Sequence, residues 1–196
     1  GQSGQTRRLR ACIIGNDFAV LAICGAPYIV NTNGLVPAGA DSKPGGFETW
    51  AAGTSLRATL QKESPRQANP VTLTDDNLNA GIQLYAKHCA VCHGTAAGDS
   101  SASQIAKGEN PGPPQLAAHG VEDDPEGWTF WKVKHGIRWS GMPAWKDVLN
   151  DRQIWTLALF LKHMDNLPSG PKAAWQAVQA GRAAAAAAPM PAQKNK

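Results

Sequence analysis

Apolar residues recur at helical spacing in the second half of the chain. Leu78, Ile82 and Tyr85 follow one another at intervals of four and three residues, which places them on one face of a helix. Residues 154–161 carry a similar but denser apolar pattern. No window alternates apolar and polar residues with period two, as a half-buried strand would. The pattern therefore predicts an all-α domain over residues 78–168, with no substantial sheet.

Polar residues, glycine and proline mark the ends of the predicted helices. Thr74 precedes two aspartates, and a hydroxyl at the N-cap with acidic groups in the first turn suits the positive end of a helix dipole. Asp124 and Pro125 indicate a second start, because proline is favoured at the first helical position. The remaining signals are a C-terminal cap at Gly136, a start at Asn150 or Asp151, and a stop at Pro168.

A separate apolar run occupies residues 11–30, directly after three arginines in residues 7–10. A basic region followed by a hydrophobic segment is typical of a secretory signal or an uncleaved anchor. The run just reaches the length of about 20 residues that a membrane span needs, although Asp17 and Pro27 interrupt it. We therefore expect a signal-anchor helix within residues 11–36.

Three fates of this segment stay open. It is an uncleaved anchor over residues 11–36, a signal cleaved at the small residues 38–40, or a lipid anchor at Cys24. The uncleaved anchor is the leading expectation, with residues 1–10 as its basic leader or as the remnant of a tag. In each case the arginines stay in the cytoplasm and the rest of the chain is exported.

The predicted domain is flanked by segments of biased composition. Residues 37–77 have the composition of a linker, with a possible short helix over residues 47–62, and residues 169–196 form a basic, alanine-rich tail that we expect to be disordered or partly helical. The net charge of +4 divides into +1 for residues 1–77, −1 for residues 78–168 and +4 for the tail. The domain itself is not basic, so nothing indicates nucleic-acid binding.

The most specific motif is Cys89-Ala90-Val91-Cys92-His93. C-x-x-C followed at once by His is the attachment site of a c-type haem. The two thiols suit thioether bonds to the vinyl groups of the haem, and His93 is then fixed where its imidazole can ligate the iron. The motif predicts one covalently attached haem c.

A C-x-x-C pair also occurs in redox dithiols and in zinc sites. A zinc site needs two further ligands at paired spacing, whereas Cys12 and Cys24 lie far upstream and His119, His135 and His163 are scattered. We expect His119 and His135 to be surface or packing residues. Haem attachment is the leading interpretation, and the dithiol and zinc interpretations stay as alternatives.

The second axial ligand of a haem is sought among three methionines. Met142 lies between Gly141 and Pro143, which predict a stiff loop that presents its thioether from a fixed direction. Met164 falls in an apolar helical pattern, where core packing is expected, and Met190 lies in the tail. Met/His ligation raises the reduction potential and fills the site where oxygen would bind. Met142 is therefore the predicted ligand, and the alternative is that it fills the core beside a haem whose sixth position is open or taken by a histidine.

These motifs resemble a class I, single-haem cytochrome c domain of the membrane-associated bacterial type, over residues 77–168. The elements that carry the resemblance follow the family's order: Gly81-x-x-x-Tyr85, Cys89-x-x-Cys92-His93, Pro114-Gln115-Leu116, Gly141-Met142-Pro143 with Ala144-Trp145, and Ile154-Trp155-x-x-Ala158-Leu159-Phe160-Leu161.

The resemblance implies the class I cytochrome c fold, in which helices surround one covalently bound haem. It implies that Gly81 lets the last helix cross closely, that the Pro114 carbonyl accepts a hydrogen bond from His93, and that Leu116 packs on the haem. Arg138 and Trp139 precede the ligand loop. They are candidates for hydrogen bonds to a haem propionate, and the alternative for Arg138 is a solvated charge.

The leading functional hypothesis is a one-electron carrier and not an enzyme. It is a membrane-tethered periplasmic cytochrome of the bacterial inner membrane that passes electrons between a dehydrogenase or quinol-oxidising complex and a terminal acceptor. A close alternative is a permanent haem subunit of an oxidoreductase or respiratory complex. A haem enzyme or gas sensor is the third hypothesis, and it needs an open or labile sixth site.

Overall fold

The computed structural model describes residues 25, 28, 30, 32–34, 38–95, 104–118 and 120–187, and of residues 104 and 182–187 only the backbone. The chain divides after Ser42, and every helix discussed below lies in the unit from Lys43 onward. Most of the predicted signal-anchor, residues 11–36, lies outside the described residues. Within the described part, no helix has both the length and the apolar character needed to cross a membrane.

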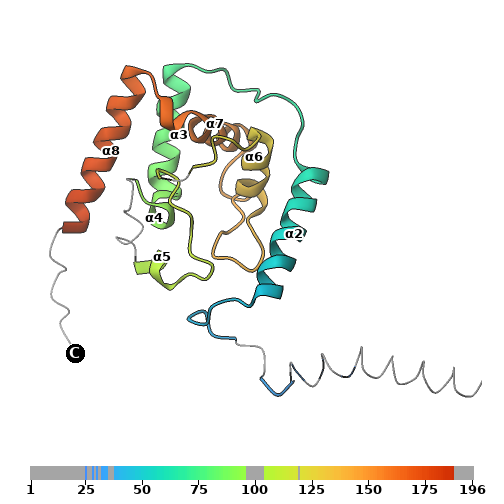
Figure 1. Ribbon diagram of the computed structural model, residues 1–196. Coiled ribbons are helices and arrows are strands. Elements are labelled where there is room, and N and C mark those ends of the chain that lie inside the picture. The colour runs from blue at the N-terminus through green and yellow to red at the C-terminus, as the bar shows by residue number, and fades with distance from the viewer. Residues whose placement is uncertain are drawn as a thin grey trace, which may run out of the picture. The chain divides into compact units, whose positions relative to one another are not determined.

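The unit is helical, and the described residues contain no strand, as the sequence pattern predicts. Figure 1 shows the helices gathered around α3 and α7, with the short α4 and α5 at one end. In chain order the elements are α2 (Gly46–Glu63), α3 (Asp75–His88), α4 (Ala90–His93), α5 (Gln104–Gly108), α6 (Glu126–His135), α7 (Asp151–His163), the 3-10 turn η2 (Met164–Asn166) and α8 (Ser169–Ala187).

Most of the predicted helix ends are confirmed. The Thr74 hydroxyl accepts a hydrogen bond from the Asn77 amide at 3.2 Å, and Asn150 starts α7 with a reciprocal capping box to Gln153. Gly136 ends α6 with φ +68°. The cap of α6 is Pro125 and not Asp124, a shift of one residue, and Pro125 supplies no side-chain oxygen to the first turn.

The centre of the unit is the crossing of α3 and α7. Gly81 allows the close approach, because a β-carbon there would lie 2.5 Å from Phe160 Cβ and 2.8 Å from the Thr156 carbonyl oxygen. Tyr85, one turn further along α3, is fully buried and meets the Phe160 ring edge-on, with centroids 5.6 Å apart. The spacing of Gly81 and Tyr85 therefore serves the helix crossing that the resemblance implies.

Helix α6 covers another side of α7. The rings of Phe130 and Trp155 stack with centroids 4.4 Å apart, and Val133 is buried beside them. Two lysines bind the acidic loop before α6. Lys132 forms a salt bridge with Asp124 at 2.6 Å, and Lys162 donates a hydrogen bond to the Glu122 carbonyl. These bonds hold the acidic loop against α6 and α7.

Helix α8 extends the packed unit beyond Pro168, into the predicted tail. The rings of Trp175, Tyr85 and Phe160 meet edge-on, and the Trp175 side chain is 6% exposed. In Figure 1 this helix runs beside α3. The composition of residues 169–196 predicts a tail that is disordered or partly helical, and residues 169–187 form a helix that contacts the core through Trp175 and Val178.

The segment before the domain is only partly a linker. The predicted helix at 47–62 is confirmed as α2, of which Leu60 is buried. Asn69 then fastens the chain to the domain, because its amide donates to Glu126 Oε1 at 2.8 Å and to the Trp155 carbonyl at 3.0 Å. Val71 follows it into the core.

Candidate functional site

The Cys89–His93 motif lies at the end of α3. Cys89 ends that helix, and α4 then makes a single turn in which the His93 amide donates to the Cys89 carbonyl at 2.9 Å. Gly94 ends the turn with φ +66°, a conformation that favours glycine. Both cysteines are free thiols and half-buried. One helical turn therefore presents both thiols and the histidine from a single short segment.

The protonation of the two thiols bears on the alternative of a redox dithiol. Burial, with the negative charge of Cys92 as a smaller cause, raises the pKa of Cys89 to about 12. Burial also raises the pKa of Cys92, and the Glu109 carboxylate adds to this by a hydrogen bond at 3.4 Å and by its charge. A catalytic dithiol needs a thiol whose pKa is lowered. The surroundings of this pair therefore disfavour dithiol chemistry.

His93 is oriented by the residue that the resemblance implies. Its Nδ1 lies 2.8 Å from the Pro114 carbonyl oxygen, which can only accept a hydrogen bond. The hydrogen bond therefore selects the neutral tautomer with the proton on Nδ1, in which the lone pair of Nε2 is left for a metal. Leu116, two residues further on, is 7% exposed and belongs to the core.

Met142 lies in a loop that is braced along its backbone. The Ile137 amide donates to the Met142 carbonyl at 3.2 Å, and the Met142 amide donates to Ser140 Oγ at 3.2 Å. A β-carbon at Gly136 would lie 2.7 Å from the Met142 carbonyl oxygen, so that position also needs glycine for space. The Met142 side chain is half-buried and contacts the core.

Contacts between distant residues bring the Met142 loop to the Cys89–His93 motif. The Glu109 carboxylate accepts a hydrogen bond from the Cys92 thiol. It also lies so close to Gly141 that a β-carbon at that position would collide with it. The rings of His88 and Trp145 meet edge-on with centroids 5.2 Å apart. The roles of Glu109 and His88 were not recognised from the sequence, because each depends on a partner far away in the chain.

The two proposed propionate partners are at the surface. Arg138 is exposed, and the Trp139 side chain is 77% exposed with a backbone φ of +60°, which non-glycine residues rarely adopt. Neither belongs to the buried core. Their assignment to a propionate stays a prediction. Of the two histidines expected outside the site, His135 is exposed against Trp131, and His119 lies outside the described residues.

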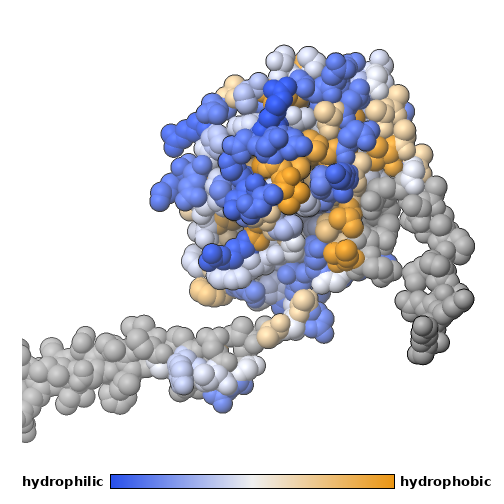
Figure 2. All heavy atoms as spheres, turned by 180° about the vertical axis from the view of Figure 1, so that it is seen from behind, coloured by the Kyte–Doolittle hydropathy of each residue, from blue (hydrophilic) through white to orange (hydrophobic). Residues whose placement is uncertain are grey.

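Large apolar side chains reach the surface around these segments. Val91 within the motif is 41% exposed and Ile105 of α5 is 58% exposed, in addition to Trp139. Figure 2 shows apolar residues interspersed among hydrophilic ones on one face of the molecule.

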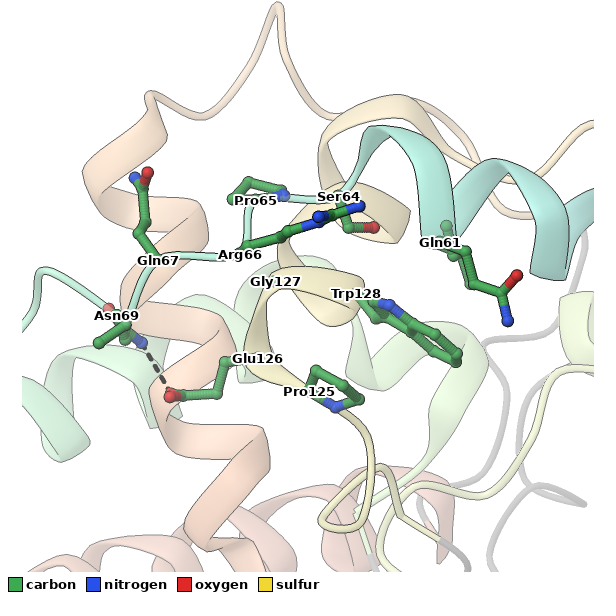
Figure 3. A pocket seen from close by; sticks show the side chains of 12 residues that line it. Gln61, Ser64, Pro65, Arg66, Gln67, Asn69, Pro125, Glu126, Gly127 and Trp128 are labelled. Atoms are coloured by element: carbon green, nitrogen blue, oxygen red, sulfur yellow. Dashed lines mark hydrogen bonds between the residues drawn. The ribbon is translucent and has the colours of Figure 1, made fainter.

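A surface hollow of about 630 Å³ lies elsewhere, between the end of α2, residues 64–69 and the start of α6. Figure 3 shows Ser64, Arg66 and Trp128 around it, with the Asn69–Glu126 hydrogen bond at one side. None of the candidate haem residues lines this hollow.

The residues at the motif fit a covalently attached haem. The donor set consists of two unpaired thiols, an imidazole whose Nδ1 is already bonded, and a thioether on a braced loop, which are the groups that a His/Met-ligated haem c requires. The zinc alternative finds no such support, because the described residues contain no group of three or more His, Cys, Asp or Glu side chains placed to bind a metal ion.

Comparison with known proteins agrees with this geometry. Residues 76–161 match the family described as cytochrome c oxidase, cbb3-type, subunit III, which covers a little under half of the chain. No curated protein and no solved structure matches the chain. The matched region contains the motif, Pro114 and Met142, and it ends before α8. The match supports a c-type cytochrome domain, with covalently bound haem c and a role in electron transfer.

Proposed function

We propose that the protein is a one-electron carrier with a single haem c ligated by His93 and Met142. The observation that carries the proposal is the convergence of two ligand segments: Pro114 orients the imidazole of His93, and the braced loop of Met142 lies against the motif through Glu109. When bound, the haem supplies an iron that takes up and releases one electron. The chain supplies two thioether attachments and two fixed axial ligands.

Fixed ligands favour a carrier over a catalyst. The hydrogen bonds through Ser140 and Ile137 hold the backbone around Met142, so that its thioether would be presented to a bound haem from a fixed segment. A sixth ligand that stays in place also keeps external molecules from the iron. These features disfavour a haem enzyme or a gas sensor, because both need an open or labile site.

The proposed location is the bacterial inner membrane, with the haem domain on the periplasmic side. The support is the arginine-rich leader before the apolar run at residues 11–30, together with the need of bacterial c-type haem to be attached after export. A tether raises the effective concentration of a carrier near membrane partners. In this proposal residues 11–36 are retained as the anchor.

The partners are redox proteins of a respiratory chain, either a dehydrogenase or a membrane complex. A second arrangement, the permanent haem subunit of an oxidase complex, is favoured by the name of the matched family. It is also favoured by α2, where Phe47 and Trp50 touch each other and are 79% and 63% exposed. Exposed aromatic pairs of this kind are frequent in interfaces that a partner covers.

The test of the proposal is spectroscopic. The full chain is expressed with a haem c maturation system, and the ferric protein is examined for the near-infrared charge-transfer bands of a methionine-ligated haem. The expected result is one haem per chain, resistant to denaturing electrophoresis, with methionine bands that Met142→Ala abolishes and Met190→Ala retains. Rapid binding of carbon monoxide by the reduced wild-type protein would contradict the carrier.

Purification from solubilised membranes separates the two arrangements. A free carrier elutes alone, whereas a permanent subunit elutes with stoichiometric partners. Replacing both Phe47 and Trp50 with serine releases those partners if α2 forms the interface.

A further inference from the structure

Helix α8 lies beyond the region that matches the cytochrome family, yet its contacts lead to the haem motif. Trp175 lies edge-on to Tyr85 at 5.5 Å and to Phe160 at 5.3 Å, so that one ring from each of α3, α7 and α8 meets at a single point. Val178, on the same side of α8, also contacts the core. The face of α8 that carries Trp175 and Val178 thus packs against α3 at the helical turn before Cys89.

The same helix bonds the backbone that follows the axial histidine. Gln179 lies one turn after Trp175, and its side-chain amide donates to the Thr95 carbonyl at 2.6 Å. Tyr85 donates to the neighbouring Gly94 carbonyl at 2.8 Å. Two successive carbonyls after His93 thus accept hydrogen bonds from side chains of α8 and α3, and Gly94 and Thr95 are both buried.

We infer that α8 is a clamp on the histidine side of the haem site, with Gln179 as its positioning residue. The inference rests on the proposed ligation of the haem by His93. The imidazole ring of His93 is held by the Pro114 carbonyl, and the backbone that follows His93 is held by the hydrogen bonds to residues 94–95. The orientation of the imidazole therefore depends on both. Because Thr95 is fully buried, its carbonyl has no ready access to water when Gln179 is removed.

Two substitutions remove the hydrogen bond in different ways. Gln179→Ala removes the whole amide, whereas Gln179→Glu keeps the size of the side chain and loses the N–H donor at neutral pH. Gln176→Ala is the matched control, because Gln176 is an exposed glutamine of the same helix. If Gln179→Ala does not fold, Gln179→Glu carries the test alone, since its volume is unchanged.

Four measurements are made on each protein. They are the covalent haem content, the shifted proton NMR signals of the axial histidine in the ferric protein, the reduction potential, and the amide hydrogen exchange of residues 92–95. We expect both Gln179 variants to retain haem, to shift the histidine signals and the potential, and to exchange those amides about tenfold faster. The control should match the wild type in all four.

The outcomes separate this inference from the proposed function. Unchanged histidine signals and an unchanged potential in both Gln179 variants would overturn the clamp, even if their melting temperatures fall, because a merely structural helix would give that result. Exchange that accelerates equally throughout the domain would overturn it as well. A wild-type chain without covalent haem would refute the proposed function first, and the inference with it.

Discussion

The crossing of α3 and α7 at Gly81 gives a prediction whose size can be worked from the structure. A β-carbon at this position would lie 2.5 Å from Phe160 Cβ and 2.8 Å from the Thr156 carbonyl oxygen. Carbon atoms in contact prefer about 3.5–4.0 Å, so that Gly81→Ala creates an overlap of about 1 Å. Neither neighbour is the free end of a flexible side chain, and the two helices must therefore move apart.

The expected cost follows from two opposing effects. Overpacking of this kind costs about 1–3 kcal/mol, and more where backbone is displaced. Alanine recovers about 0.5–1 kcal/mol because glycine is unfavourable in a helix interior. We expect a net loss of about 2 kcal/mol in the free energy of unfolding, which corresponds to a fall of about 4–8 °C in melting temperature for a chain of this size.

The control for this substitution is Gly53→Ala in α2. A β-carbon at Gly53 meets nothing within 4 Å, so that only the gain in helix propensity remains. Its stability should equal that of the wild type or exceed it by up to about 1 kcal/mol. Both variants are compared by thermal and chemical denaturation. A Gly81→Ala protein that melts at or above the temperature of the Gly53→Ala protein would show that the helices do not cross as closely as described.

Other predictions concern the haem site and its surroundings. A double substitution of Cys89 and Cys92 by alanine should abolish haem that survives denaturing electrophoresis, and haem retained in that assay would refute covalent attachment. Met142→Ala should lower the reduction potential and let the reduced protein bind carbon monoxide, whereas an unchanged potential in a redox titration would assign the ligand to another residue. Burial raises the pKa of Glu122 above its ordinary value of 4.5; a backbone hydrogen bond opposes this shift, and the charge and hydrogen bonding of Asp165 add to it. The stability that its protonated form contributes is present below pH 4.5 and is lost as the pH rises through the raised pKa, so Glu122→Gln should lose less stability than the wild type between acid and neutral pH in denaturation experiments.

Local features of the fold could be predicted because their causes lie within a few residues. Thr74 and Asn150 cap helices through atoms three residues away, and Gly136 ends a helix through its own φ. The N-cap of α6 lies one residue later than predicted, and this difference has a local cause too. Pro125 takes the capping position there, and Asp124 pairs with a lysine instead of capping the helix.

The candidate site likewise contains features with local causes and features that depend on residues far apart in the chain. The motif Cys89, Cys92 and His93 could be recognised from the sequence because its members lie within five residues, whereas the single turn of α4 that presents them is seen only in the structure. The bond from His93 to Pro114 joins residues 21 apart, and only the resemblance to a family indicated it. The role of Glu109 between Cys92 and Gly141 had no signal in the sequence, since a single half-buried carboxylate has no periodicity.

By itself, the sequence determined the helical class, most of the helix ends, and the Cys89–His93 motif with its candidate ligands, since these depend on periodicity and short-range chemistry. Tertiary structure alone decided the course of the alanine-rich segment after Pro168. Its composition permits disorder or helix equally, and the choice depends on Trp175 meeting the rings of Tyr85 and Phe160. Burial of a large aromatic side chain stabilises a helix that is marginal in isolation. The partners of that side chain are fixed only when α3 and α7 have crossed.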